Sequence, residues 1–171
     1  IMTYDSGDYP AALDAALERA GYDGFKARQE AARAEGRYLG IGVANYVEGT
    51  GRGPFESAVV RVKPSGKVVI YTGATDQGQG LKTALAQVCA AQTGAAMEDI
   101  DVVTGDTGTV SLGLGAFASR QAVTAGSSVH VAALEVRQKA LKVAAHLLEA
   151  AEEDLDLADG RISVRGVPDM S

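Results

Sequence analysis

The sequence predicts an α/β fold of the α+β kind, in two layers, with a mixed sheet packed against helices. Runs of β-branched residues alternate along the chain with stretches in which apolar residues recur at helical spacing. Glycine or proline stands at most of the boundaries between them. Hydrophobic residues make up 46% of the 171 residues, so the chain can bury one core of ordinary size.

The expected helix ends are marked by residues that favour starting or stopping a helix. Pro10 falls in a first turn and Gly21 follows a last turn. Asp23 is then expected to cap a second helix that ends at Gly36. Gly94 is the expected stop of a third helix, and a long Ala, Val and Leu pattern predicts a fourth. The predicted helices lie near residues 10–20, 23–35, 79–93 and 122–152.

The β-forming runs predict four strands, near residues 39–49, 56–63, 67–72 and 100–104. The turn Pro64-Ser65-Gly66-Lys67 joins the second strand to the third as a hairpin. Gly160 and the sequence RISVRG indicate a final strand or hairpin arm. We expect a helical connector over residues 1–36 and a larger domain over residues 37–171.

Composition argues against several classes of function. The net charge of −6, with no run of Lys and Arg, disfavours a nucleic-acid partner. No stretch reaches the roughly 18 apolar residues that a membrane span needs, so we expect a cytoplasmic protein. Cys89 is the single cysteine and cannot form an internal disulfide or a thiolate cluster. Because His130 and His146 are too far apart to share one helix-face site, the sequence predicts no metal bound by side chains.

A first glycine-rich segment, GATDQGQGLKT over residues 73–83, lies between a predicted strand and a predicted helix. Glycines allow a ligand to approach the backbone, and the free N–H groups of a helix start attract anions. Gln77 and Gln79 add amides that both donate and accept, which suits a polar heterocycle. The alternative is a turn that only packs the helix on its strand. A nucleotide P-loop fits poorly because Leu81 separates Gly80 from Lys82, and no dinucleotide-binding fingerprint is completed at Thr83.

A second segment, GLGAFASRQAVT over residues 113–124, precedes the long helix. Arg120 offers a planar fork that matches phosphate oxygens, and Ser119, Gln121 and Thr124 offer hydroxyl and amide groups. Two such segments could hold one extended anionic ligand. The alternative is that Arg120 pairs with Asp106 or another carboxylate and fixes the loop.

These segments, in this order, resemble the molybdopterin-binding portion of the molybdenum hydroxylase family, which includes xanthine dehydrogenase, aldehyde oxidase and the carbon monoxide dehydrogenase large subunit. Gln77-Gly78-Gln79-Gly80, with Thr83 and Gln87, resembles the family's Gly-Gln-Gly pterin segment. Residues 105–129 resemble the loop and helix start that hold the phosphate-bearing end of the cofactor, and residues 4–51 resemble the family's connector. The resemblance therefore covers almost the whole chain.

The resemblance implies a fold of the molybdenum cofactor-binding domain type and a set of cofactor contacts. In the family, molybdenum is held by a molybdopterin, in bacteria often as the cytosine dinucleotide, with essentially no protein ligand to the metal. Carried over by position, the pterin and molybdenum end would contact Gln77, Gly78, Gln79 and Gly80. The pyrophosphate region would contact Arg120, Gln121, Ala122 and Thr124. Val43 and Ala44 would approach the substrate funnel, and the lack of an aromatic residue near Val43 disfavours a purine substrate.

The resemblance also implies oxidative hydroxylation of a small aldehyde, heteroaromatic or related substrate, with electrons passed to iron-sulfur and FAD groups on partner domains or subunits. The family's glutamate base lies downstream of these segments and another cofactor-contacting region lies upstream. We therefore expect residues 37–171 to form a partial molybdopterin-binding domain with no catalytic residue of its own, inactive when isolated. The rival interpretation is a non-catalytic phosphate-binding or subunit-assembly module, and a P-loop-like nucleotide hydrolase is the weakest.

Overall fold

The structure, a computed structural model, describes residues 3–167 and 169–171. The chain divides into two compact units, Ile1–Val47 and Glu48–Ser171. The sequence predicted the division after residue 36, where the second helix was expected to end. The first unit in the structure also includes the extended segment that follows this helix.

The first unit contains two helices that begin and end close to the expected positions. Asp8 precedes the first helix and its Oδ1 accepts the N–H of Ala11 at 3.0 Å. Gly21 ends that helix in the left-handed conformation, with φ 61°. The expectation that Asp23 caps the second helix is wrong, because the residue that precedes this helix is Gly24 and no side chain caps it. The two helices are α1 (Tyr9–Ala20) and α2 (Phe25–Ala34).

The strand predicted near residues 39–49 is wrong. Residues 37–49 are assigned to no helix or strand, and neither sheet in the described part of the chain includes them. A β-strand requires a neighbour that accepts and donates its backbone hydrogen bonds. Alternating polarity alone does not supply that neighbour, and the side chains of this segment are exposed, with Tyr38 at 83% and Tyr46 at 79%.

The second unit contains the predicted mixed sheet, with strand order β1-β2-β3. The first pair is antiparallel and the second pair is parallel. The turn between the first pair is closed by Lys63, whose N–H donates to the carbonyl of Lys67 at 2.8 Å, and Gly66 has φ 85°. These observations confirm the predicted hairpin. The strands are β1 (Ala58–Val62), β2 (Val68–Thr72) and β3 (Ile100–Thr104).

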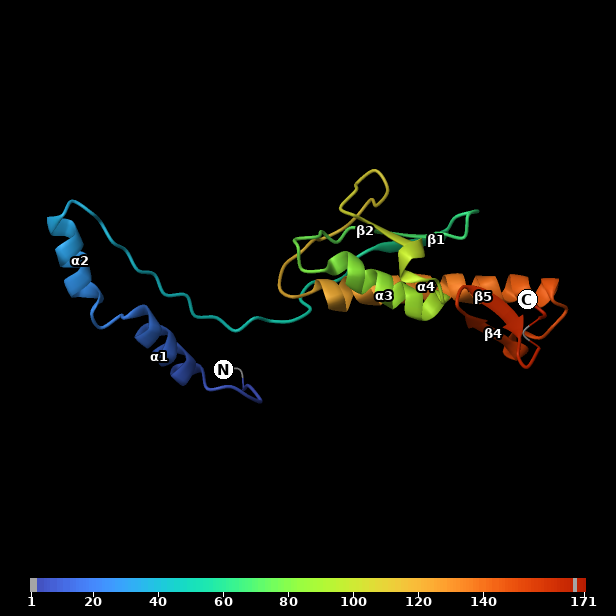
Figure 1. The fold of residues 1–171 in the computed structure, drawn as a ribbon, viewed down its shortest axis with the longest axis horizontal. Helices are drawn as coiled ribbons and strands as arrows, with labels where there is room; N and C mark the ends of the chain where they lie inside the picture. Colours follow the sequence, from blue (N-terminus) through green and yellow to red (C-terminus); the bar gives the residue numbers. More distant parts are fainter. Residues whose placement is uncertain (1–2, 168) are drawn as a thin grey trace. The chain divides into compact units, whose positions relative to one another are not determined.

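Two helices pack against each other and against this sheet, which gives the predicted two layers (Figure 1). α3 (Leu81–Thr93) connects β2 to the parallel strand β3, and α4 (Gln121–Leu147) is the longest helix. The core between the layers includes Ile70, Leu85 and Val129, which are at most 1% exposed. The β2–α3–β3 connection therefore brings the loop before α3 to the carboxyl end of the parallel strands.

The carboxyl end of α4 differs from the prediction, which extended this helix to residue 152. The helix stops at Leu147, and Glu149 takes a left-handed conformation with φ 52°. The apolar spacing is lost in the acidic stretch that follows, so the helix has no further apolar face to pack. Gly160 turns the predicted final hairpin. The strands of this hairpin are β4 (Leu155–Ala158) and β5 (Arg161–Val164). Elsewhere in the second unit, Met97–Asp99 and Glu152–Asp154 form short 3₁₀ helices.

Candidate functional site

The two glycine-rich segments lie in direct contact in the second unit. We call residues 73–80 the glutamine loop and residues 111–120 the arginine loop. A Cβ atom built on Gly113 would lie 2.5 Å from the Cα of Gly73, and a Cβ built on Gly73 would overlap Gly113 in the same way. Only glycine lets two backbones approach so closely. The two loops therefore meet because both positions lack a side chain.

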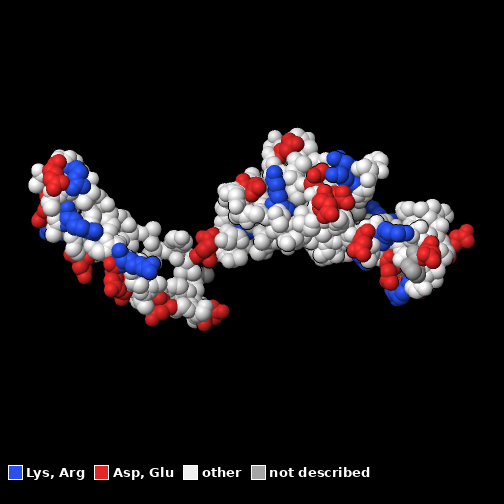
Figure 2. Space-filling view, viewed as in Figure 1, with Lys and Arg blue, Asp and Glu red and all other residues white. Residues whose placement is uncertain are grey.

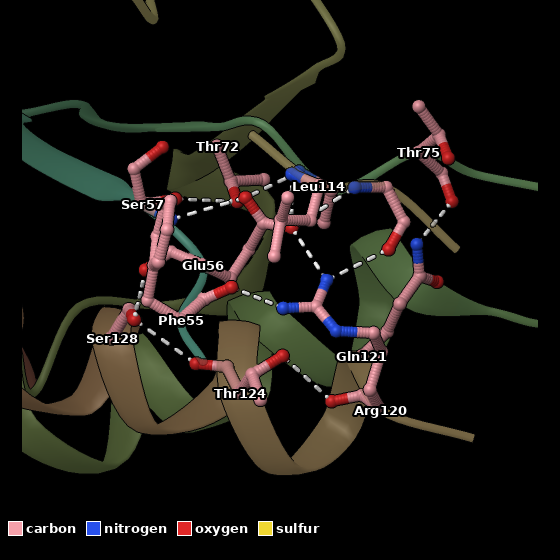
Figure 3. Close-up of polar contacts among 12 residues, drawn as sticks. Phe55, Glu56, Ser57, Thr72, Thr75, Leu114, Arg120, Gln121, Thr124 and Ser128 are labelled. Atoms are coloured by element: carbon pink, nitrogen blue, oxygen red, sulfur yellow. Dashed lines mark hydrogen bonds and ion pairs between the residues drawn. The ribbon is translucent and has the colours of Figure 1, made fainter. Parts of the chain in front are cut away.

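A pair of glutamine side chains extends this contact. The Nε2 of Gln79 donates to the Oε1 of Gln121, and the Nε2 of Gln121 donates to the carbonyl of Thr75 at 2.7 Å. The Oε1 of Gln79 also accepts the N–H of Gln77 at 2.7 Å. The amide of Gln121 is thus held at both ends by the glutamine loop, and Figure 3 shows its contact with Thr75. The predicted convergence of the two segments is present in the structure.

A hollow of about 460 Å³ lies between the two loops and is lined by Gln77, Gln79 and residues 116–122. None of these residues carries a carboxylate. α4 begins at this hollow, and α3 begins two residues after Gln79, which lines it. Both helices lie wholly within the described residues, and neither has a side-chain cap or an acidic residue in its first turn. Their first N–H groups and the positive ends of their dipoles therefore make the hollow suited to an anion.

The backbone around the hollow adopts an unusual conformation. Ala118 and Ser119 have φ values of 48° and 46°, in the left-handed region that residues with a Cβ rarely occupy. The carbonyl of Ala118 accepts the N–H of Gly51 at 3.1 Å, and the hydroxyl of Ser119 donates to Glu48 at 3.2 Å. Strain of this kind persists only where surrounding contacts hold it, and it concentrates at functional sites.

The Arg120 side chain is fully buried. Its Nη1 donates to the Oε2 of Glu56 and to the carbonyl of Gly115, both at 2.9 Å. Its Nε donates to the carbonyl of Arg52 at 2.9 Å, and its Nη2 donates to the carbonyl of Phe55. The structure therefore supports the alternative in which Arg120 pairs with a carboxylate, and that carboxylate is Glu56.

Glu56 is the residue that the sequence analysis missed. Its Oε2 accepts the N–H groups of Leu114 and Gly115, both at 3.2 Å, in addition to the Nη1 of Arg120. Its Oε1 accepts the N–H of Ser57 at 3.1 Å, so both carboxylate oxygens have partners within the protein (Figure 3). A single glutamate 64 positions before its partner arginine forms no local pattern, so no sequence signal identified it.

A family model described as a molybdopterin cofactor-binding domain matches residues 15–171. The chain belongs to this family. The family match and the arrangement of the two loops agree with the resemblance that these loops carry. The hollow should therefore suit a molybdopterin, the cofactor named in the description of the family.

Similar proteins extend the family assignment. The carbon monoxide dehydrogenase large chain of Afipia carboxidovorans is 38% identical over 97% of this chain and 23% of its own length. The xanthine dehydrogenase molybdenum-binding subunit of Escherichia coli O157:H7 is 33% identical over 90% of this chain and 22% of its own. The solved structure of quinoline 2-oxidoreductase from Pseudomonas putida 86 has a TM-score of 0.65 and 39% identity over 99% of this chain and 23% of that one. The chain thus spans about a quarter of the length of the relatives it matches.

The remaining predicted site residues lie in different surroundings. Gly78, Gly80 and Ala122 are exposed at the hollow or at the start of a helix beside it. The Oγ1 of Thr124 donates to the carbonyl of Arg120 at 2.9 Å, so this hydroxyl is engaged within its own helix. Val43 and Ala44 are exposed in the first unit. Their contact with a substrate remains a prediction, as do the individual cofactor contacts.

Two acidic residues near the loops make hydrogen bonds within their own turns. The Oδ1 of Asp76 accepts the N–H of Gly78 at 3.2 Å, and the Oδ1 of Asp106 accepts the N–H of Gly108 at 2.9 Å. Such contacts with the backbone two residues on are typical of turns. Both carboxylates therefore shape their loops.

Charges on the visible face of the second unit are mixed in sign, with Lys and Arg interspersed among Asp and Glu (Figure 2). Within the residues that the structure describes, no helix has the length and apolar character needed to cross a membrane. Across the same residues, no three His, Cys, Asp or Glu side chains gather in a group that could hold a metal ion.

Proposed function

We infer that the chain forms part of the cofactor-binding site of a cytoplasmic molybdenum hydroxylase. The enzyme would act on a small aldehyde, a heteroaromatic ring or a related substrate. The observation that carries this inference is the convergence of the glutamine loop, the arginine loop and the starts of α3 and α4 on one hollow. Membership in the family supports it. The chain spans about a quarter of its relatives, so the reaction belongs to the larger protein.

The residues at the hollow fit a molybdopterin. The side-chain amides of Gln77 and Gln79 donate and accept hydrogen bonds, as the edges of a pterin ring require. The backbone N–H groups at the starts of α3 and α4 suit phosphate oxygens, and no carboxylate in the lining repels them. We assign Gln77, Gly78, Gln79 and Gly80 to the pterin end. Gln121 and Ala122 are assigned to the phosphate end, in a cytosine dinucleotide form of the cofactor.

This chain would bind and orient the cofactor. When bound, the cofactor supplies the oxidative hydroxylation. Gln121 is held between Gln79 and Thr75, so its amide is fixed before a ligand arrives, and fixed donors lose little entropy on binding. The general base is assigned to residues outside this chain. Electrons would leave through iron-sulfur and flavin groups on partners, and Val43 and Ala44 would border the substrate funnel.

The proposal is tested on the complete subunit purified with its partner subunits. Elemental analysis should find molybdenum, and fluorescence after oxidation should find pterin. A Gln79→Ala variant should lose molybdenum, because one of the two hydrogen bonds that join the glutamine loop to Gln121 at the start of α4 is removed. Gln138→Ala provides the matched control, since Gln138 is exposed on α4 beyond its first turns. An active complex that contains neither molybdenum nor pterin would contradict the proposal and favour the assembly role.

A further inference from the structure

We propose that Arg120 serves the hollow indirectly, as half of a buried ion pair with Glu56 that positions the arginine loop. Arg120 and Glu56 are then positioning residues, and the anion is bound by backbone N–H groups and the start of α4. This inference rests on the proposed function for the identity of the ligand. It differs from the sequence-based prediction that Arg120 contacts the pyrophosphate itself.

The hydrogen bonds of Arg120 leave little for a ligand. A guanidinium has five N–H groups, and four protein oxygens accept from this one. Its Cζ atom also lies 5.0 Å from the ring centre of Phe117. With the side chain at 0% exposure, no part of the guanidinium faces solvent. A phosphate that reached Arg120 would have to displace contacts that are already made.

The charge of Arg120 is also compensated within the protein. The Oε2 of Glu56 lies 2.9 Å from its Nη1, and both side chains are fully buried. In surroundings of low dielectric constant, a pair this close attracts an external anion much less than an isolated cation does. The remaining attraction at the hollow comes from the two helix starts.

The pair connects two separate segments of the second unit. Arg120 donates to the carbonyl of Arg52, and Figure 3 shows its contact with the carbonyl of Phe55 before β1. Glu56 accepts the N–H groups of Leu114 and Gly115 in the arginine loop. The left-handed residues 118 and 119 directly precede Arg120 in the chain, and Gln121 directly follows it. The pair thus determines where one wall of the hollow lies, while the glutamine loop forms the opposite wall.

Gly53 shows how closely this arrangement is packed. It has φ 107°, and a Cβ at this position would lie 3.0 Å from the Nε of Arg120. The backbone of the 52–56 segment therefore runs directly against the guanidinium. A contact of this kind is expected where the arginine organises the polypeptide around it.

The experiment uses the complete, cofactor-loaded complex and a double-mutant cycle. The variants are Glu56→Gln, Arg120→Met and the combination of both, and the measurement is the rate at which molybdenum leaves the protein during dialysis. If the pair positions the loop, each single variant accelerates loss by about 10- to 100-fold, the usual effect of removing a group that orients a binding residue. The double variant should be no faster than either single variant, because it leaves no buried charge unpaired.

Direct contact between Arg120 and the ligand predicts the opposite pattern. Arg120→Met would then accelerate loss, Glu56→Gln would leave it near the wild-type rate, and the two effects would multiply. That pattern would overturn the proposal. Ile70→Val is the control for a general loss of stability, since Ile70 is fully buried in the core and belongs to neither loop. It should lower the unfolding temperature without accelerating molybdenum loss.

A second measurement does not depend on the cofactor. Hydrogen exchange of Leu114 and Gly115 should accelerate in Glu56→Gln, because their N–H groups lose a charged acceptor. The exchange of Val69 and Ile70 in the central strand should not change. Unchanged protection of the loop amides would overturn the positioning role even in a variant that retains molybdenum. A wild-type complex without molybdenum contradicts the proposed function alone, and the exchange measurement still decides the role of the pair.

Discussion

Replacing Gly113 with alanine should separate the two loops that form the hollow. The new Cβ would lie 2.5 Å from the Cα of Gly73 and 2.8 Å from its carbonyl oxygen. Ordinary carbon–carbon contacts are about 3.5 Å or longer, so the backbones must move apart by about 1 Å. Overpacking of this kind costs about 1–3 kcal/mol of unfolding free energy. For a chain of this size, the unfolding temperature should fall by about 2–12 °C.

Gly126→Ala is the matched control for this substitution. Gly126 lies inside α4, and a Cβ there would meet nothing within 4 Å outside its own helix. Alanine at such a position should raise the unfolding free energy by about 0.4–1 kcal/mol. Thermal unfolding followed by circular dichroism compares both variants with the wild-type chain. The reasoning fails if Gly113→Ala unfolds at the wild-type temperature and the complete subunit carrying it retains its molybdenum.

Two further predictions concern α1 and the core. Asp8→Ala should destabilise α1 by about 0.5–2 kcal/mol, because the N–H of Ala11 loses its acceptor. Proton chemical shifts of residues 9–12 report this fraying, and unchanged shifts would contradict the capping role. Burial raises the pKa of the Cys89 thiol, so less thiolate forms at mildly alkaline pH than in a free thiol. Native protein should therefore react slowly with an aromatic disulfide and rapidly in urea, and equal rates in both would refute the burial.

The fold could be predicted wherever the local pattern and its partner both lie within the chain. Strand β2, α3 and β3 follow from their apolar spacing and from the Gly94 stop, since all three pack on one another. Residues 39–49 show the same kind of alternation, but no described strand pairs with them. Their sequence favours a strand, but a strand forms only where another strand pairs with it.

The candidate site could be predicted in outline for a different reason. Glycine spacing and helix starts are local features, so both loops were identified from their residues. The partner of Arg120 depends on how a distant segment is folded against it, and the nearby Asp106 was an equally reasonable choice in the sequence. Asp106 instead holds its own turn through Gly108, and the buried carboxylate is Glu56.

The packing of α3 and α4 also determines how far apart the two helix starts lie, and so how long a ligand must be to reach both. α3 and α4 lie side by side, and apolar side chains such as Leu85 and Val129 fill the space between the helices and the sheet. The spacing between the two sets of N–H groups is therefore set by the volume of core side chains that no ligand touches. Larger or smaller residues at these positions would change the distance between the two helix starts.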